Sequence, residues 1–132
     1  MQSSKYILFA GRTETGIASL FKSLIHKGIN VETVETLYEL IAKMKAVPPA
    51  VIAMNTCFEE VKCHQLIPII KALNPDSSII IISSGNDPEV ERGSRIQGII
   101  YYAIIPDDLE KLPEVIEKAV KAAGQREIGV PK

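Results

Sequence analysis

The sequence contains no tryptophan, only two cysteines, and aromatic side chains at just 5% of its 132 residues. Two cysteines, Cys57 and Cys63, are too few for a disulfide framework at this length, so we expect a reduced, cytoplasmic protein. The longest apolar run covers residues 99–105, far short of the roughly 18 residues that a membrane-spanning helix needs. The first residues also lack the basic start and long apolar stretch of a secretory signal.

An excess of charge is missing as well. The chain has 15 Lys and Arg against 16 Asp and Glu, which gives a net charge of -1. This balance removes the electrostatic reason to expect binding to nucleic acid or to an anionic membrane. The length and the 46% hydrophobic content fit one folded domain with a sizeable core.

Apolar runs and helical stripes alternate along the chain. Isoleucine is abundant, at 20 residues, which suits strands that are buried on both faces. The expected strands are 6–10, 29–34, 50–54, 79–82 and 99–105, and helical spacing follows each of them. The last helix is expected to open at Asp107–Asp108 and to close at Gly124. This pattern predicts one α/β domain over residues 1–124, a (βα)5 doubly wound parallel sheet, with a tail at 125–132.

In a sheet of this kind, ligands and chemistry lie at the carboxyl ends of the strands. The residues at those ends are Gly11 and Arg12 after the first strand, Asn55 after the third, Ser83 after the fourth, and Ile105–Pro106 after the fifth.

At these positions the sequence resembles the receiver domains of bacterial two-component response regulators, over roughly residues 5–124. The resemblance implies the flavodoxin-like receiver architecture with strand order 2-1-3-4-5. A receiver carries an acidic pair for Mg²⁺, a phosphorylatable aspartate, a Thr or Ser, and a Lys-Pro. The matching positions here are Gly11 and Arg12, Asn55, Ser83, and Ile105–Pro106, and the aromatic switch position is Tyr102. The resemblance further implies a cis Ile105–Pro106 peptide bond.

The chemical positions depart from the receiver pattern. An amide at Asn55 cannot attack a phosphoryl donor, and Arg12 places a cation where Mg²⁺ needs an anion. Gly11 supplies no ligand, and Ile105 lacks the amine that would pair with a phosphoryl group. We therefore expect a degenerate receiver, a pseudo-receiver that is not an enzyme and holds no metal and no cofactor.

Each of these residues also has a plain structural interpretation. Ser83 can cap the end of a strand, Tyr102 can be a half-buried core aromatic, and Asn55 can satisfy backbone groups in a turn. The receiver interpretation rests on their falling together at the family's spacing.

A different class of function is an alternative. The segment Thr13–Gly16 resembles the Thr-x-Thr-Gly phosphate loop of flavodoxins, which would make this a small-molecule or FMN-binding domain. Ala18 stands where a further hydroxyl is usual, and Glu14 places an anion inside the loop. The plain interpretation is a threonine that caps the first helix.

The other polar clusters are weaker evidence for a functional site. Cys57, Cys63 and His64 lack the second pair of ligands that a zinc site shows. Cys63 is expected to pack on the third helix. The acidic pairs Glu59–Glu60 and Asp107–Asp108 are typical of helix starts.

The expected function is signalling through protein–protein contact, with a partner protein or a second copy. The surface would be formed by the fourth helix, the fifth strand and the fifth helix. The fifth strand is apolar on both faces although it lies at the sheet edge, and the helix beside it has few large apolar residues. Tyr101, Tyr102 and Ile104 are the expected contact residues.

Overall fold

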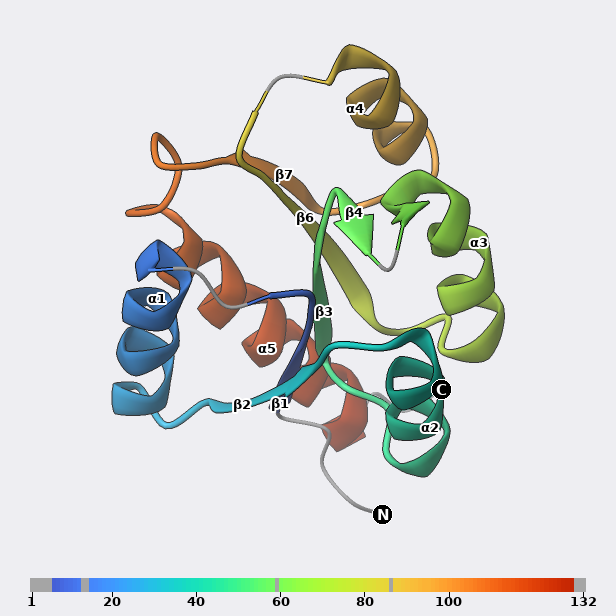
Figure 1. Cartoon of the computed structure of the whole chain (residues 1–132). Coiled ribbons are helices and arrows are strands. Elements are labelled where there is room, and N and C mark those ends of the chain that lie inside the picture. Colours follow the sequence, from blue (N-terminus) through green and yellow to red (C-terminus); the bar gives the residue numbers. More distant parts are fainter. Residues whose placement is uncertain (1–5, 13–14, 59, 86, 130–132) are drawn as a thin grey trace.

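The computed structural model describes residues 6–12, 15–58, 60–85 and 87–129. Its main sheet has five parallel strands in the order β2-β1-β3-β6-β7 (Figure 1). The strands of that sheet are β1 (Tyr6–Ala10), β2 (Asn30–Val34), β3 (Val51–Asn55), β6 (Ser78–Ser83) and β7 (Tyr101–Ile104). The helices are α1 (Thr15–His26), α2 (Leu37–Ala46), α3 (Cys63–Leu73), α4 (Pro88–Arg95) and α5 (Leu112–Gly129). The predicted fold class and strand order are confirmed; only the strand numbers differ, because a small hairpin intervenes.

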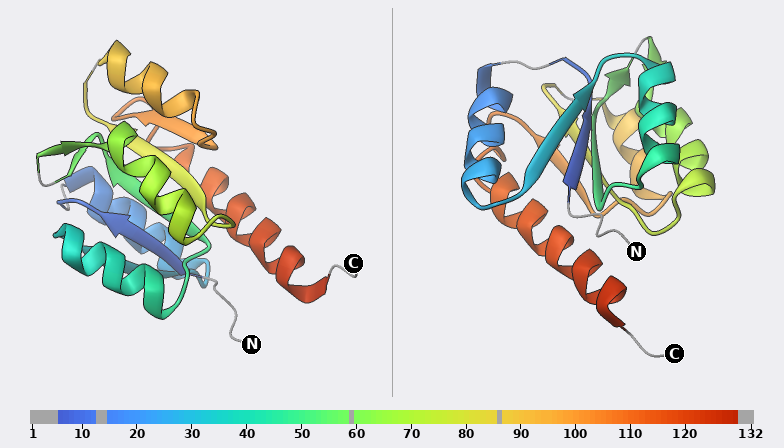
Figure 2. Two further views of the ribbon diagram at one scale, coloured as in Figure 1. Left: turned by 90° about the vertical axis from the view of Figure 1, so that its right-hand side faces the viewer. Right: turned by 90° about the horizontal axis from the view of Figure 1, so that it is seen from below.

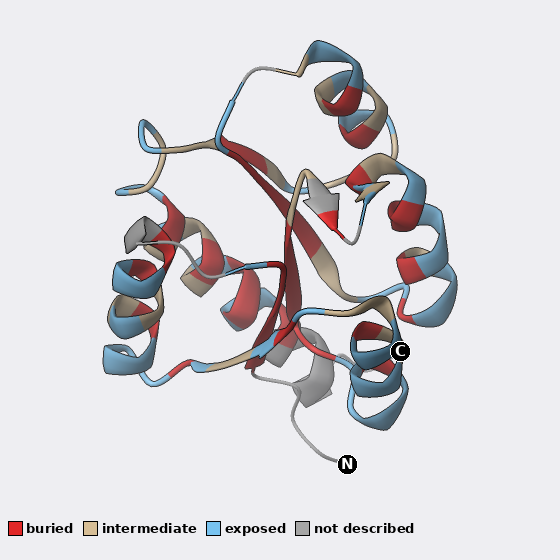
Figure 3. Cartoon of the chain, viewed as in Figure 1, coloured by how far each residue is buried: buried red, intermediate tan, exposed pale blue. Residues whose placement is uncertain are grey.

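Helices cover both faces of the sheet. Along β1 the side chains alternate, so that Leu8 joins the core under α2, α3 and α4 while Phe9 joins the core under α1 and α5. Figure 2 shows the two helical layers edge-on, and Figure 3 shows buried residues along the strands with exposed residues on the outer helix faces. The run Ile79–Ile82 is buried throughout, as expected for a strand covered on both faces.

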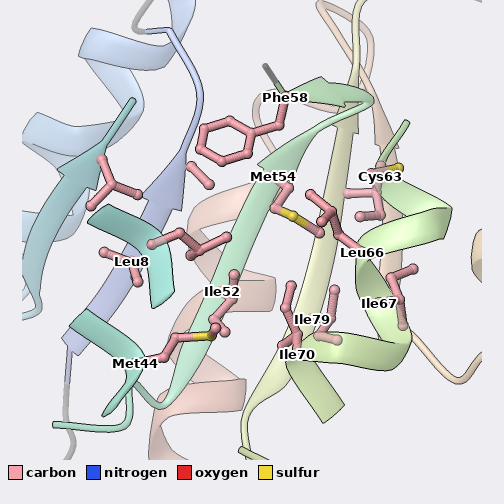
Figure 4. Packing of buried hydrophobic residues seen from close by; sticks show 14 of the residues in the cluster. Leu8, Met44, Ile52, Met54, Phe58, Cys63, Leu66, Ile67, Ile70 and Ile79 are labelled. Carbon is pink, nitrogen blue, oxygen red and sulfur yellow. The ribbon is translucent and has the colours of Figure 1, made fainter. Parts of the chain in front are cut away.

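The chain forms a second, two-stranded sheet that the sequence did not predict. β4 (Cys57–Phe58) pairs antiparallel with β5 (Val61–Lys62), and Glu60 in the turn has a φ of 64°. The prediction that Glu59–Glu60 starts a helix is therefore wrong at Glu60, and Glu59 lies outside the described residues. Phe58 is buried in the cluster that contains Met54 and Leu66 (Figure 4).

Two further boundaries differ from the prediction. α5 begins at Leu112, after a turn segment in which the Asp108 carboxylate accepts a hydrogen bond from the backbone N–H of Ile104 at 2.8 Å. Asp107–Asp108 is thus not a helix start. α5 also continues past Gly124 to Gly129 and extends beyond the body of the domain (Figure 2).

One side of α3 faces the core. Its buried residues are Cys63, Leu66, Ile67 and Ile70, whereas Ile69 and Leu73 are exposed. Cys63 packs inward as expected. No helix in the described part of the chain is long and apolar enough to cross a membrane.

Candidate functional site

The predicted site residues meet at the carboxyl edge of the main sheet. β1 and β3 are neighbours, with Ala10 opposite Met54, so Gly11 and Asn55 follow side by side. β6 and β7 are neighbours too, with Ser83 opposite Ile104. The sheet therefore brings the separate sequence positions to one edge, in two adjoining halves.

In the first half, Asn55 occupies the space beside Gly11. A Cβ atom built on Gly11 would lie 2.7 Å from Asn55 Nδ2 and 2.9 Å from Asn55 Cγ. Gly11 also has a φ of 143°, a conformation that residues with a side chain rarely adopt. A longer side chain at position 11, a carboxylate included, has no room while Asn55 holds this position.

Arg12 follows Gly11 and is exposed. Its guanidinium is a permanent cation, so it disfavours a metal ion in its neighbourhood. Among the described residues, no group of three or more His, Cys, Asp or Glu side chains is placed to hold a metal ion.

In the second half, Ser83 is buried and bonded locally. Its hydroxyl donates to the Gly85 carbonyl at 2.6 Å and accepts from the Gly85 backbone N–H at 3.2 Å. The hydroxyl therefore stabilises the turn that leaves β6.

Tyr102 points inward and is only 4% exposed, within the core under α3 and α4. Its hydroxyl has no hydrogen-bond partner in the described structure. Burial raises the pKa of Tyr102, and the nearby Ser83 side chain acts in the opposite direction. On the outer side, the Arg95 guanidinium lies 5.6 Å from the centre of the Tyr102 ring.

Ile105 ends this half of the edge. Its backbone N–H donates to the Ser83 carbonyl at 2.8 Å, and its side chain packs against the core under α1 and α5. The Ile105–Pro106 peptide bond is cis, so the prediction from the receiver resemblance is confirmed.

The expected contact surface is placed differently from the prediction. Tyr102 is buried, so the prediction that it lies on a contact surface is wrong for this conformation, and Tyr101 and Ile104 are half-buried. The exposed apolar side chains beside β7 are instead Ile96 at 79% and Ile100 at 46%.

The sequence also did not predict the close contact between α3 and α4. A Cβ on Gly93 would lie 2.9 Å from His64 Cδ2, and the Gln97 side-chain amide donates to the His64 carbonyl at 2.6 Å. The Cys63 thiol lies 3.5 Å from the Ser94 hydroxyl, and burial raises the pKa of Cys63. The signal was present as two small residues, Gly93 and Ser94, inside a predicted helix.

The alternative flavin loop is only partly within the described structure. Thr13 and Glu14 lie outside the described residues, and of Thr15 and Gly16 only the helical backbone is described. Flavin binding at Thr13–Gly16 stays a prediction, and a visible absorption spectrum of the purified protein tests it.

No protein-family model matches the sequence, and no curated protein matches it. Solved structures do match the fold, and the structural neighbours are response-regulator receiver domains of the CheY-like type. The beryllofluoride-activated NtrC4 receiver domain dimer is 24% identical, with a TM-score of 0.79, over 90% of this chain and 98% of that one. A CheY-like receiver domain protein from Methanospirillum hungatei JF-1 is 20% identical, with a TM-score of 0.79, over 94% of this chain and 99% of that one.

A third neighbour belongs to a family of redox sensors in the streptococci that evolved from two-component response regulators. It is 17% identical, with a TM-score of 0.78, over 97% of this chain and 57% of that one. At these identities the likeness shows the fold.

Proposed function

We propose that this chain is a cytoplasmic signalling domain of the two-component type, a receiver fold that does not accept a phosphoryl group and acts through protein–protein contact. It performs no catalytic turnover. Tyr101, Ile104 and the exposed residues of α4 belong to its contact surface, together with α5.

The observation that carries this proposal is the packing of Asn55 against Gly11. Phosphoryl transfer at this edge needs a carboxylate nucleophile and a divalent cation held by further carboxylates. Asn55 offers an amide in place of the nucleophile. Its side chain also fills the space next to Gly11, so a carboxylate ligand at position 11 has no room. The nucleophile and a metal ligand are therefore both missing, at two positions that pack against each other.

Two further residues support the same conclusion. Arg12 contributes a positive charge where the cation would be bound, and Ile105 packs against the core under α1 and α5 instead of extending an amine over the edge. Four positions thus lack the charges that a phosphoryl group and its metal ion require.

The neighbours support a contact function for the fold. The NtrC4 receiver domain is named as a dimer, and the streptococcal redox sensors are named as descendants of response regulators. The role proposed for this chain is signalling through contact, without phosphoryl transfer.

The test is incubation with a small phosphodonor and Mg²⁺, followed by intact mass spectrometry. We expect no added phosphoryl group on the unchanged chain. The variant Asn55→Asp should also stay unmodified, because Gly11, Arg12 and Ile105 still supply no metal ligand and no amine. A phosphoryl group on the unchanged chain, lost on replacement of a nearby acidic residue, would contradict the proposal.

A further inference from the structure

The outer face of α3 carries no charged residue. Its exposed residues are Gln65, Pro68, Ile69, Ala72 and Leu73. Ile69 is 46% exposed and Leu73 is 39% exposed, and the two lie one turn apart on the same side of the helix. Each of the other four helices has a charged side chain among its exposed residues, such as Lys22, Lys45, Glu89 and Lys118. An exposed apolar face without charges is typical of a site of protein contact.

Ile69 and Leu73 lie on the side of α3 that is turned away from α4. The opposite side of α3 meets α4 at His64, whose ring lies against Gly93. Because helical spacing separates Ile69 and Leu73 from His64, they face α2, which covers the same face of the sheet as α3 (Figure 1).

α2 adds an exposed aromatic ring to this surface. Lys43 forms an ion pair with Glu32 of β2, so that side of α2 faces β2. Tyr38 lies on the opposite side of α2 by helical spacing, toward α3, and is 82% exposed. Tyr38, Ile69 and Leu73 therefore form one apolar surface, which we call the α2–α3 patch.

The α2–α3 patch is fixed in position before any contact forms. Pro68 lies inside α3 and has no N–H, so the His64 carbonyl lacks its usual partner within the helix. The Gln97 side-chain amide donates to that carbonyl instead, at 2.6 Å. At the end of α3, the Asn74 side-chain amide donates to the Met44 carbonyl of α2 at 3.4 Å. A surface held in this way loses little conformational entropy on binding.

The two ends of α3 carry opposite charges. Lys62, directly before α3, is exposed, and so is Asp76 in the turn that follows the helix. Ile69 lies midway between them in the sequence. When two α3 helices pack antiparallel about a two-fold axis at Ile69, Lys62 of each copy lies near Asp76 of the other. A two-fold contact uses the same patch on both molecules, and this patch is complementary to itself.

We infer that the α2–α3 patch binds a second copy of this chain, through antiparallel α3 helices around a two-fold axis. The patch is separate from the contact surface proposed above, so the inference goes beyond the proposed function. The net charge of -1 adds little repulsion between two copies. α3 has 11 residues and is only about 16 Å long, so the contact is smaller than the usual interface of about 800 Å² per partner. The dimer is therefore weak and depends on concentration.

The experiment is sedimentation equilibrium of the full chain over a range of concentrations. Ile69→Glu places two carboxylates against each other at the axis and should weaken the dimer on the order of tenfold. Tyr38→Ser removes apolar contact without adding charge and should weaken it less. Ile25→Glu is the matched control, because Ile25 is 59% exposed on α1, over the other face of the sheet. That control should dimerise like the unchanged chain, and circular dichroism checks that every variant is folded.

A mixture of two charge variants provides the sharpest test. K62E puts a negative charge at both ends of α3, and D76K puts a positive charge at both ends, so each variant alone meets like charges in the dimer. Together the two variants form opposite-charge contacts at both ends. Distinct fluorescent labels should therefore report a mixed dimer at concentrations where each variant alone is monomeric.

Several outcomes overturn the inference. One is a chain that stays monomeric at about 1 mM, a concentration that reveals even weak association. Another is a dimer that is insensitive to Ile69→Glu, or one that is weakened by Ile96→Ser on α4 in its place. A mixture of folded K62E and D76K chains that shows no recovery also contradicts the antiparallel arrangement. If D76K does not fold, the comparison of Ile69→Glu with Ile25→Glu still decides between a dimer at this patch and none.

Discussion

The two halves of the carboxyl edge differ in what their residues do for the fold. At the ends of β1 and β3, Gly11 and Asn55 contact each other and carry no charge. At the ends of β6 and β7, Ser83 fixes a turn and Tyr102 fills the core beneath α3 and α4. The first half departs from the receiver pattern at Gly11, Arg12 and Asn55, whereas the second half keeps Ser83 and Tyr102 and departs from it only at Ile105.

The difference shows how chemistry and packing are separated in one site. Gly11 and Asn55 offer no carboxylate to a metal ion, and their contact with each other only fills space. Tyr102 is a large buried side chain whose removal leaves a cavity, so its ring stabilises the fold whether or not the first half binds anything. The presence of Tyr102 alone is therefore no sign of phosphorylation chemistry.

The largest effect is expected at Tyr102. Tyr102→Ala should lower the free energy of unfolding by about 3 kcal/mol, because it leaves a cavity between β7 and α4. Chemical denaturation measures the loss. Tyr102→Phe is the control and should stay within about 1 kcal/mol of the unchanged chain, because the hydroxyl has no hydrogen-bond partner among the described residues. An equal loss in both variants would mean that the hydroxyl, and not the ring, stabilises this half.

A smaller effect is expected at Gly11. Gly11→Ala should cost about 2 kcal/mol, since the new Cβ meets Asn55 at 2.7 Å and the backbone conformation is strained. Gly28→Ala is the matched control, because Gly28 also has a positive φ, but a Cβ atom there would meet nothing within 4 Å. It should cost only the backbone strain. Thermal unfolding of the two variants compares them, and equal losses would show that Asn55 does not fill the space.

The smallest effect is a dependence on pH in the second half. The pKa of Tyr102 is raised above its ordinary value of 10.0 by burial, so the folded state holds the phenolic proton more tightly than the unfolded state. The corresponding stability is present below pH 10.0 and is lost as the pH rises through the folded pKa. Tyr102→Phe lacks this phenol, so the variant should become more stable relative to the unchanged chain as the pH rises above 10.0. Parallel stability curves for the two proteins would contradict the assignment.

The sequence is sufficient for most of the fold because its signals are local. Ile79–Ile82 is apolar throughout and forms a buried strand. Asp87, directly before Pro88, accepts a hydrogen bond from the Val90 backbone N–H and so caps α4. The hairpin of β4 and β5 was missed because strands of two residues are too short to show a period. The end of α5 was missed because glycine often ends a helix, whereas Gly124 lies inside this one.

The sequence predicted where the site residues lie in the fold, but not which residues they contact. Asn55, Ser83 and Ile105 lie at the strand ends where the sequence placed them. Which residues contact them, however, depends on packing between distant segments of the chain. Nothing near Gly11 in the sequence indicates that the Asn55 side chain fills the space beside it. For the same reason the sequence did not indicate that Gly93 is the residue that lets α4 approach His64.

The contact between α3 and α4 has a consequence for how the molecule opens. A short helix at a sheet edge usually frays alone, and its amide protons exchange with solvent long before those of the core. Here Gln97 holds the end of α4 to the backbone of α3, and Lys71 holds the Gly98 carbonyl at 3.3 Å. Amide exchange in α4 should therefore require α3 to open too, which makes the two helices one unit of local unfolding.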